Sequence, residues 1–95
     1  FDPEHFVNLI DKTLISAIDY YKKQLEYQNK AKKLKAKASY YKQIASRYAR
    51  YKKMYLNYAK RLEYYAKRYK YYGKRYAYYA SYYKKRADYY MSWVN

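Results

Sequence analysis

Residues 63–76 read EYYAKRYKYYGKRY, two successive copies of a seven-residue unit. If Tyr69 and Tyr76 occupy position a of a heptad, Tyr72 occupies position d. The same spacing continues in both directions, well beyond the three or four heptads that indicate a coiled coil. A period of 3.5 residues is typical of left-handed supercoiled helices. The sequence therefore predicts an all-α protein with a long heptad-repeat helix, as a coiled coil, a helical bundle or a fibre.

Tyrosines at a and d form a ladder along one helix face, because side chains three and four residues apart are neighbours. Each ring combines a large apolar surface with a hydroxyl that needs a hydrogen-bond partner when buried. The predicted helix-packing seam consists of Tyr41, Tyr48, Tyr51, Tyr55, Tyr58, Tyr65, Tyr69, Tyr72, Tyr76, Tyr79, Tyr83 and Tyr90.

Small and basic residues flank this ladder. Small residues at position e are expected to let a second helix approach closely. They are Ala59, Ala66, Gly73 and Ala80. Positions f and g carry much of the positive charge, and we expect them to form a basic face. Its residues are Arg47, Lys53, Lys60, Arg61, Lys67, Arg68, Lys74 and Arg75.

Three segments differ in pattern. Residues 1–25 have an aliphatic face with helical spacing, and Asp2-Pro3-Glu4 is a favourable helix start. Residues 26–38 form a Lys-rich connector with a weak seam, and residues 39–95 carry the Tyr/Ala/Lys-Arg heptads. A bend or hairpin within 26–38 is one interpretation. The absence of Gly and Pro there favours a continuous or gently bent helix.

The composition is strongly basic: 23 Lys and Arg stand against 7 acidic residues, for a formal charge of +16. Such an excess favours anionic partners. There is no cysteine, and no apolar run is long enough to predict a transmembrane segment. His5 has no second His or Cys to complete a metal site, and no catalytic or cofactor-binding motif is present. We therefore expect a non-enzymatic protein without cofactor or metal.

Two functions fit these features. The first is a structural protein that self-assembles into helical fibres or bundles through the Tyr/Ala seam. The start at Phe1 rather than Met fits a mature secreted protein, so we expect an extracellular material. The second is a basic helical binding protein for an acidic partner, such as a matrix glycoprotein, another polyanion or nucleic acid. Salt separates them, because polyanion binding weakens steeply with ionic strength whereas repulsion between like-charged helices is screened.

Two resemblances bear on these alternatives. The heptad design resembles that of coiled-coil structural proteins such as insect silks, with Tyr in place of their Ala or Leu seam. The end segments, residues 2–8 (DPEHFVN) and 90–95 (YMSWVN), resemble parts of gastropod sperm lysins. That resemblance implies a basic helical protein that binds an egg coat. The heptads between the two segments depart from the lysin pattern.

Overall fold

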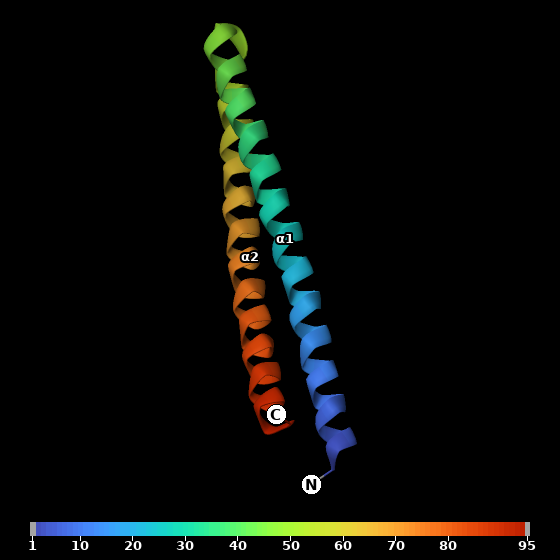
Figure 1. Ribbon diagram of the computed structural model, residues 1–95. Coiled ribbons are helices and arrows are strands. Elements are labelled where there is room, and N and C mark those ends of the chain that lie inside the picture. Colours follow the sequence, from blue (N-terminus) through green and yellow to red (C-terminus); the bar gives the residue numbers. More distant parts are fainter. Residues whose placement is uncertain (1, 95) are drawn as a thin grey trace. The chain divides into compact units, whose positions relative to one another are not determined.

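The computed structural model describes residues 2–94, which form two long helices. Helix α1 spans Pro3–Arg47 and helix α2 spans Lys52–Val94. Tyr48 and a short 3₁₀ turn, Ala49–Tyr51 (η1), join them (Figure 1). The described residues contain no strand. The all-α fold class predicted from the heptads is thus confirmed.

Helix α1 begins where the sequence predicts. The Asp2 carboxylate accepts a hydrogen bond from the Glu4 backbone N–H at 3.1 Å, and the Asp2 carbonyl accepts one from the Phe6 N–H at 3.3 Å. Pro3 occupies the first helical position, where its missing N–H costs nothing. Local capping chemistry therefore determines this boundary.

The chain reverses at Tyr48, outside the segment 26–38, which is helical throughout. Tyr48 leaves the helix with φ −119° and ψ 89°. Its N–H still donates to the Ile44 carbonyl at 3.1 Å, and its own carbonyl accepts from the Tyr51 N–H at 3.2 Å. No non-glycine residue in the described chain has a positive φ, so this reversal needs no glycine. The heptad pattern predicts a single helix over residues 39–95. The turn instead divides this segment between α1 and α2.

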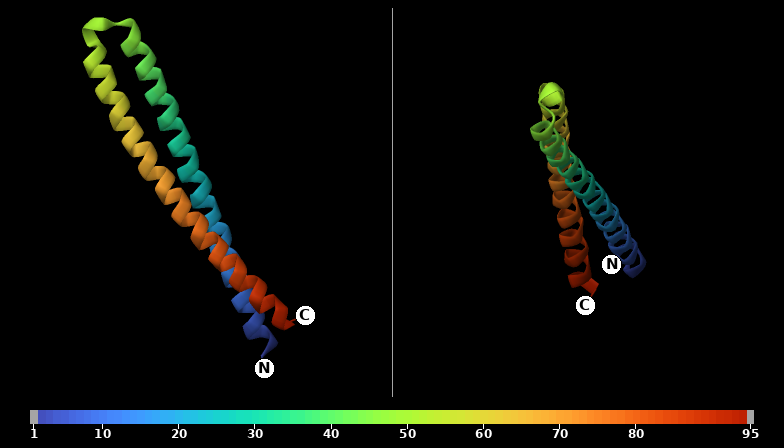
Figure 2. Two further views of the ribbon diagram at one scale, coloured as in Figure 1. Left: turned by 90° about the vertical axis from the view of Figure 1, so that its left-hand side faces the viewer. Right: turned by 90° about the horizontal axis from the view of Figure 1, so that it is seen from above.

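Two compact units make up the chain. Unit 1 combines Phe1–Leu25 with Lys74–Asn95, and unit 2 is Glu26–Gly73. Unit 2 is a helical hairpin in which the second half of α1 and the first half of α2 run antiparallel on either side of the turn (Figure 2). Unit 1 pairs the start of α1 with the end of α2. Each unit therefore buries one helix face against a partner helix from the same chain.

Small side chains form the buried centre of each unit. In unit 2, Ala38, Ala45 and Ala59 are 0–2% exposed, and in unit 1 Ala87 is fully buried. No large side chain of the described residues is fully buried. Methyl groups at the centre allow the helix backbones to approach closely, and larger side chains then cover the sides of the contact.

Tyrosine rings cover the alanine contacts with a regular register. In unit 2 the Tyr41 ring lies 5.9 Å from the Tyr55 ring and 5.8 Å from the Tyr58 ring. Two heptads earlier in α1, Tyr27 lies 5.6 and 5.8 Å from Tyr69 and Tyr72, which are two heptads later in α2. Aromatic pairs of this kind contribute about 0.5–1.5 kcal/mol each beyond their area burial.

Unit 1 has the same arrangement of aromatic rings, but near the chain termini a phenylalanine and a tryptophan take part in it. The Tyr20 ring lies 6.0 Å from Tyr76, 5.3 Å from Tyr79 and 5.6 Å from Tyr83. Near the termini, the Phe6 ring lies 6.4 Å from both Tyr90 and Trp93. Each of these α1 rings therefore contacts two or three rings of α2, and those α2 rings are three or four residues apart in the sequence.

Candidate functional site

The predicted seam tyrosines divide into two environments. Those at position a, with the exception of Tyr48, are half-buried at the helix contact: Tyr41, Tyr55, Tyr69, Tyr76, Tyr83 and Tyr90. Among the d residues, Tyr72 and Tyr79 are half-buried, whereas Tyr51, Tyr58 and Tyr65 are exposed. Tyr48 lies in the turn and is exposed. The predicted small residues Ala59, Ala66 and Gly73 are buried, and Ala80 is half-buried.

The structure therefore shifts the centre of the seam from a and d to a and e. The alanines at e lie innermost, whereas the d tyrosines are half-buried or exposed. The α1 alanines Ala38 and Ala45 also sit at e, and they are as deeply buried as Ala59. Because e follows a by four residues, a and e repeat as evenly as a and d do. Spacing alone does not distinguish these two seams.

A second row of tyrosines, at position c, lies on the outside of α2. Tyr64 and Tyr71 in unit 2 are each 57% exposed, and Tyr78 in unit 1 is 69% exposed. Each ring meets its d neighbour edge-on; the Tyr64 and Tyr65 centroids, for example, are 5.5 Å apart. These side chains keep one open face toward solvent. Their repetition every seven residues is visible in the sequence, although the predicted site did not include them.

Arginines of α2 donate hydrogen bonds to half-buried tyrosines one turn further along the helix. In unit 2, Arg68 donates to the Tyr72 hydroxyl at 3.1 Å and lies 5.8 Å from the Tyr64 ring centroid. In unit 1, Arg75 donates to the Tyr79 hydroxyl at 3.0 Å. The hydrogen bond to Tyr72 is the main cause that raises the pKa of Arg68 above its usual value. The guanidinium groups are thus oriented by phenols while they remain exposed.

Arg86 makes the same arrangement near the end of α2. It donates to the Tyr82 hydroxyl at 3.3 Å and to the Tyr90 hydroxyl at 2.7 Å. The hydrogen bond to Tyr90 raises the pKa of Arg86. Arg86 sits at a d position and was not among the predicted site residues. We call the outer Arg and Tyr side chains of each unit its Arg/Tyr face: Tyr64, Arg68 and Tyr71 in unit 2, and Arg75, Tyr78, Tyr82, Arg86 and Tyr89 in unit 1.

Lysines of α1 lie beside the ring clusters. In unit 1, the Lys23 ammonium is 5.8 Å from the Tyr20 centroid and 5.4 Å from the Tyr76 centroid. In unit 2, Lys30 is 5.0 Å from Tyr27 and 5.7 Å from Tyr69. Cation–π contacts at such exposed sites are weak, because water solvates the ammonium group. Lysines at position d therefore flank the seam instead of entering it.

Most of the positive charge has no counter-charge within the chain. Glu26 pairs with Lys30 at 3.1 Å, and Glu63 of α2 pairs with Lys42 of α1. Seven acidic residues cannot neutralise 23 basic ones. All eight residues of the predicted basic face are exposed: Arg47, Lys53, Lys60, Arg61, Lys67, Arg68, Lys74 and Arg75.

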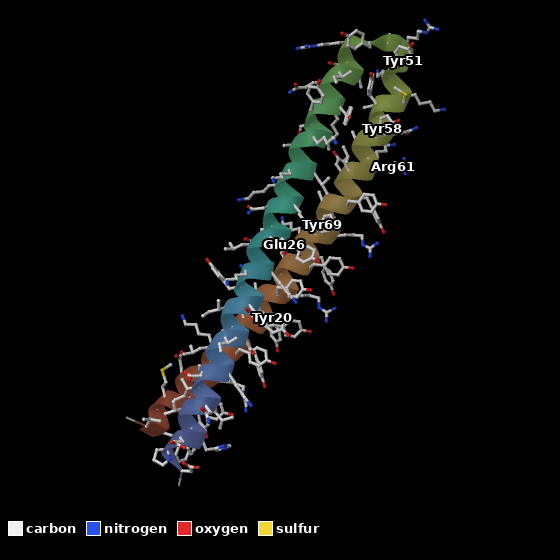
Figure 3. All side chains as sticks on the ribbon, turned by 90° about the vertical axis from the view of Figure 1, so that its right-hand side faces the viewer. Tyr20, Glu26, Tyr51, Tyr58, Arg61 and Tyr69 are labelled. Atoms are coloured by element: carbon white, nitrogen blue, oxygen red, sulfur yellow. The ribbon has the colours of Figure 1, made fainter. Side chains whose placement is uncertain are left out.

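A shallow recess of about 250 Å³ lies in unit 2 between the two helices. Lys37 and Tyr41 line it from α1. Tyr58, Arg61, Leu62 and Tyr65 line it from α2. Figure 3 shows Tyr58 and Arg61 close together on α2. The recess thus combines two cations with three phenol rings, and Lys37 and Leu62 were not predicted to belong to a site.

Neither a metal centre nor a membrane span is found in the described part of the chain. Residues 2–94 contain no group of three or more His, Cys, Asp or Glu side chains placed to hold an ion. None of the helices over these residues has the length and apolarity that crossing a bilayer requires. Comparison with known proteins adds no further guide: no family model, no curated protein and no solved structure matches this chain.

Proposed function

We propose that this chain is a non-catalytic, basic helical protein that binds an acidic partner through the Arg/Tyr face of each unit. The observation that carries the proposal is the Arg/Tyr face, where phenol hydroxyls orient exposed guanidinium groups. These cations belong to a chain whose formal charge is +16. An anionic polymer would relieve this self-repulsion as it binds.

Repetition suits the face to a polymer. Residues one heptad apart on a helix are separated by about 10.5 Å along its axis. In unit 2, Tyr64 and Tyr71 of the face recur at this interval, and Arg68 of the face follows Arg61, which lies outside the face, at the same interval. A partner with a regular series of negative charges could engage several of these cations at once. Many weak contacts would then add up without any deep pocket.

Charge-matched variants test this proposal. Replacing Arg68, Arg75 and Arg86 with Gln removes three cations from the face. Replacing Lys12, Lys22 and Lys32 of α1 with Gln removes the same charge elsewhere. With heparin as the probe polyanion, we expect the arginine variant to lose far more affinity than the lysine variant. We also expect it to show a shallower dependence of binding on salt concentration. Equal losses in the two variants would reject the Arg/Tyr face as the binding surface.

Self-assembly into a secreted structural material is the second candidate. The observation in its favour is the row of exposed tyrosines Tyr64, Tyr71 and Tyr78. Because the alanine contacts are already occupied within each unit, assembly would use this outer row instead of the inner seam. Sedimentation at rising salt concentration distinguishes the two functions: screening should promote association between like-charged chains and should release a polyanion.

A further inference from the structure

We infer that the acidic partner is a single-stranded nucleic acid, and that the recess of unit 2 seats one of its bases. This inference rests on the proposed function and specifies the partner. Its starting point is the composition of the recess, because Lys37 and Arg61 stand beside the rings of Tyr41, Tyr58 and Tyr65. A ligand that fits this lining carries both a planar ring and a negative charge.

Size supports one base as the occupant. Pockets for drug-sized ligands typically measure about 300–1,000 Å³. The recess, at about 250 Å³, is smaller and suits a single ring system. Tyr58 is 43% exposed and Tyr65 is 47% exposed, so both rings offer an uncovered surface. They are one heptad apart on α2, and Arg61 lies between them in sequence.

Exposed rings distinguish a nucleic acid from an acidic glycan. Sulfated or carboxylated sugars would engage the cations but have no aromatic face to stack. Bases stack on tyrosine whatever their sequence, and the backbone phosphates follow a positively charged groove. In unit 2, Tyr64 and Tyr71 are exposed next to the hydrogen-bonded guanidinium of Arg68. Cations and open rings therefore alternate beyond the recess as well.

Exposure of the bases favours a single strand over a duplex. Base faces in a duplex are stacked on one another, and only base edges are reached in the grooves. A convex helix surface with projecting phenols can stack only on bases that are already unpaired. A duplex would still bind through its phosphates, but it would gain nothing from the tyrosines.

The test uses the full chain with three probes of similar length: an oligothymidylate, an abasic oligonucleotide with the same phosphates, and heparin. At moderate salt we expect the oligothymidylate to bind roughly 5- to 150-fold more tightly than the abasic strand, the range that one stacked base supplies. We expect Tyr58→Leu to remove most of this difference. The control Tyr21→Leu changes an exposed tyrosine of α1 outside the recess and should leave the difference intact.

Arg61→Gln completes the test. We expect it to weaken both oligonucleotides alike, because the phosphate is present in each. Equal affinity for the two strands in the unchanged protein would overturn the nucleic-acid inference, and the proposed function would stand if heparin still bound. Retention of the full base-dependent gain in Tyr58→Leu would overturn the recess as the base site. Absence of binding to all three probes at moderate salt would overturn the proposed function itself.

Discussion

The two sides of α2 use the same residue type for different purposes. On the inner side, Tyr55 packs against Tyr41 of α1 beside the fully buried Ala59. On the outer side, Tyr64 and Tyr71 keep more than half of their surface open. The difference follows from the neighbours: alanines let α1 approach one side, whereas lysines and arginines keep the other side hydrated. The role of a tyrosine in this protein is therefore set by the size and charge of the residues beside it.

The largest effect is expected from filling the alanine contact. In Ala59→Leu, three additional carbon atoms enter a position with no exposed surface. Overpacking of this kind costs about 1–3 kcal/mol. The control, Ala36→Leu, makes the same change at an exposed position of α1. Urea unfolding followed by circular dichroism measures both. Equal stability of the two variants would mean that the helices do not approach as closely as described.

A smaller loss is expected when an inner ring is removed. Tyr41→Leu keeps an apolar side chain but loses the ring contacts with Tyr55 and Tyr58. We expect the free energy of unfolding to fall by about 1 kcal/mol. The same change at Tyr78, the most exposed outer tyrosine, should stay within about 0.5 kcal/mol of the unchanged protein. The distinction between the two sides fails if Tyr78→Leu is the more damaging change.

A local effect is expected at Arg86, which bonds the exposed Tyr82 and the half-buried Tyr90. Arg86→Gln removes the donors to the Tyr82 and Tyr90 hydroxyls. Backbone amides in the last turns of α2 should then exchange hydrogen several-fold faster, with little change in global stability. Lys85→Gln removes the same charge from an exposed neighbour and serves as the control. Similar exchange in both variants would show that Arg86 does not hold the helix end.

The smallest effect concerns pH. The hydrogen bond from Lys42 lowers the pKa of Glu63 below its usual 4.5. A lowered carboxyl pKa in the folded state stabilises the protein above that usual value, and the contribution is lost as pH falls through the folded pKa. We expect the free energy of unfolding to decrease slightly below pH 4.5, and Glu63→Gln to lack this part of the decrease. Lys42→Gln should behave in the same way. Unchanged acid dependence in both variants would contradict the assignment.

The heptad pattern is sufficient to predict the helices but not the point where the chain reverses. Lys52, which stands where other heptads have a small residue at e, is the one local sign of the reversal. Tyr48 falls on an a position and therefore continues the predicted ladder. Its backbone makes the turn with a negative φ, so neither Gly nor Pro marks the site. The Lys-rich segment 26–38 has the weaker seam pattern, yet its lysines simply lie beside the seam.

The candidate site is predictable in kind but not in position. The repeated arginines and tyrosines of the sequence are enough to indicate a cationic aromatic surface. Arg61 and Tyr58 lie beside Lys37 because the position of the turn sets the register between the helices of unit 2. The repeat pattern alone does not predict this contact. Leu62 joins the recess for the same reason. Contacts between residues far apart in the sequence depend on the geometry of the connecting turn. The spacing of residues within one helix does not reveal that geometry.

The constant register of unit 2 has a consequence for its length. Tyr27 and Tyr41 are two heptads apart in α1, and their partners Tyr69 and Tyr55 are two heptads apart in α2. Removing one whole heptad from each helix between these pairs should keep the Tyr27–Tyr69 and Tyr41–Tyr55 pairs in register. The length of the hairpin can therefore be changed in steps of one heptad, about 10.5 Å, without designing a new interface between its helices.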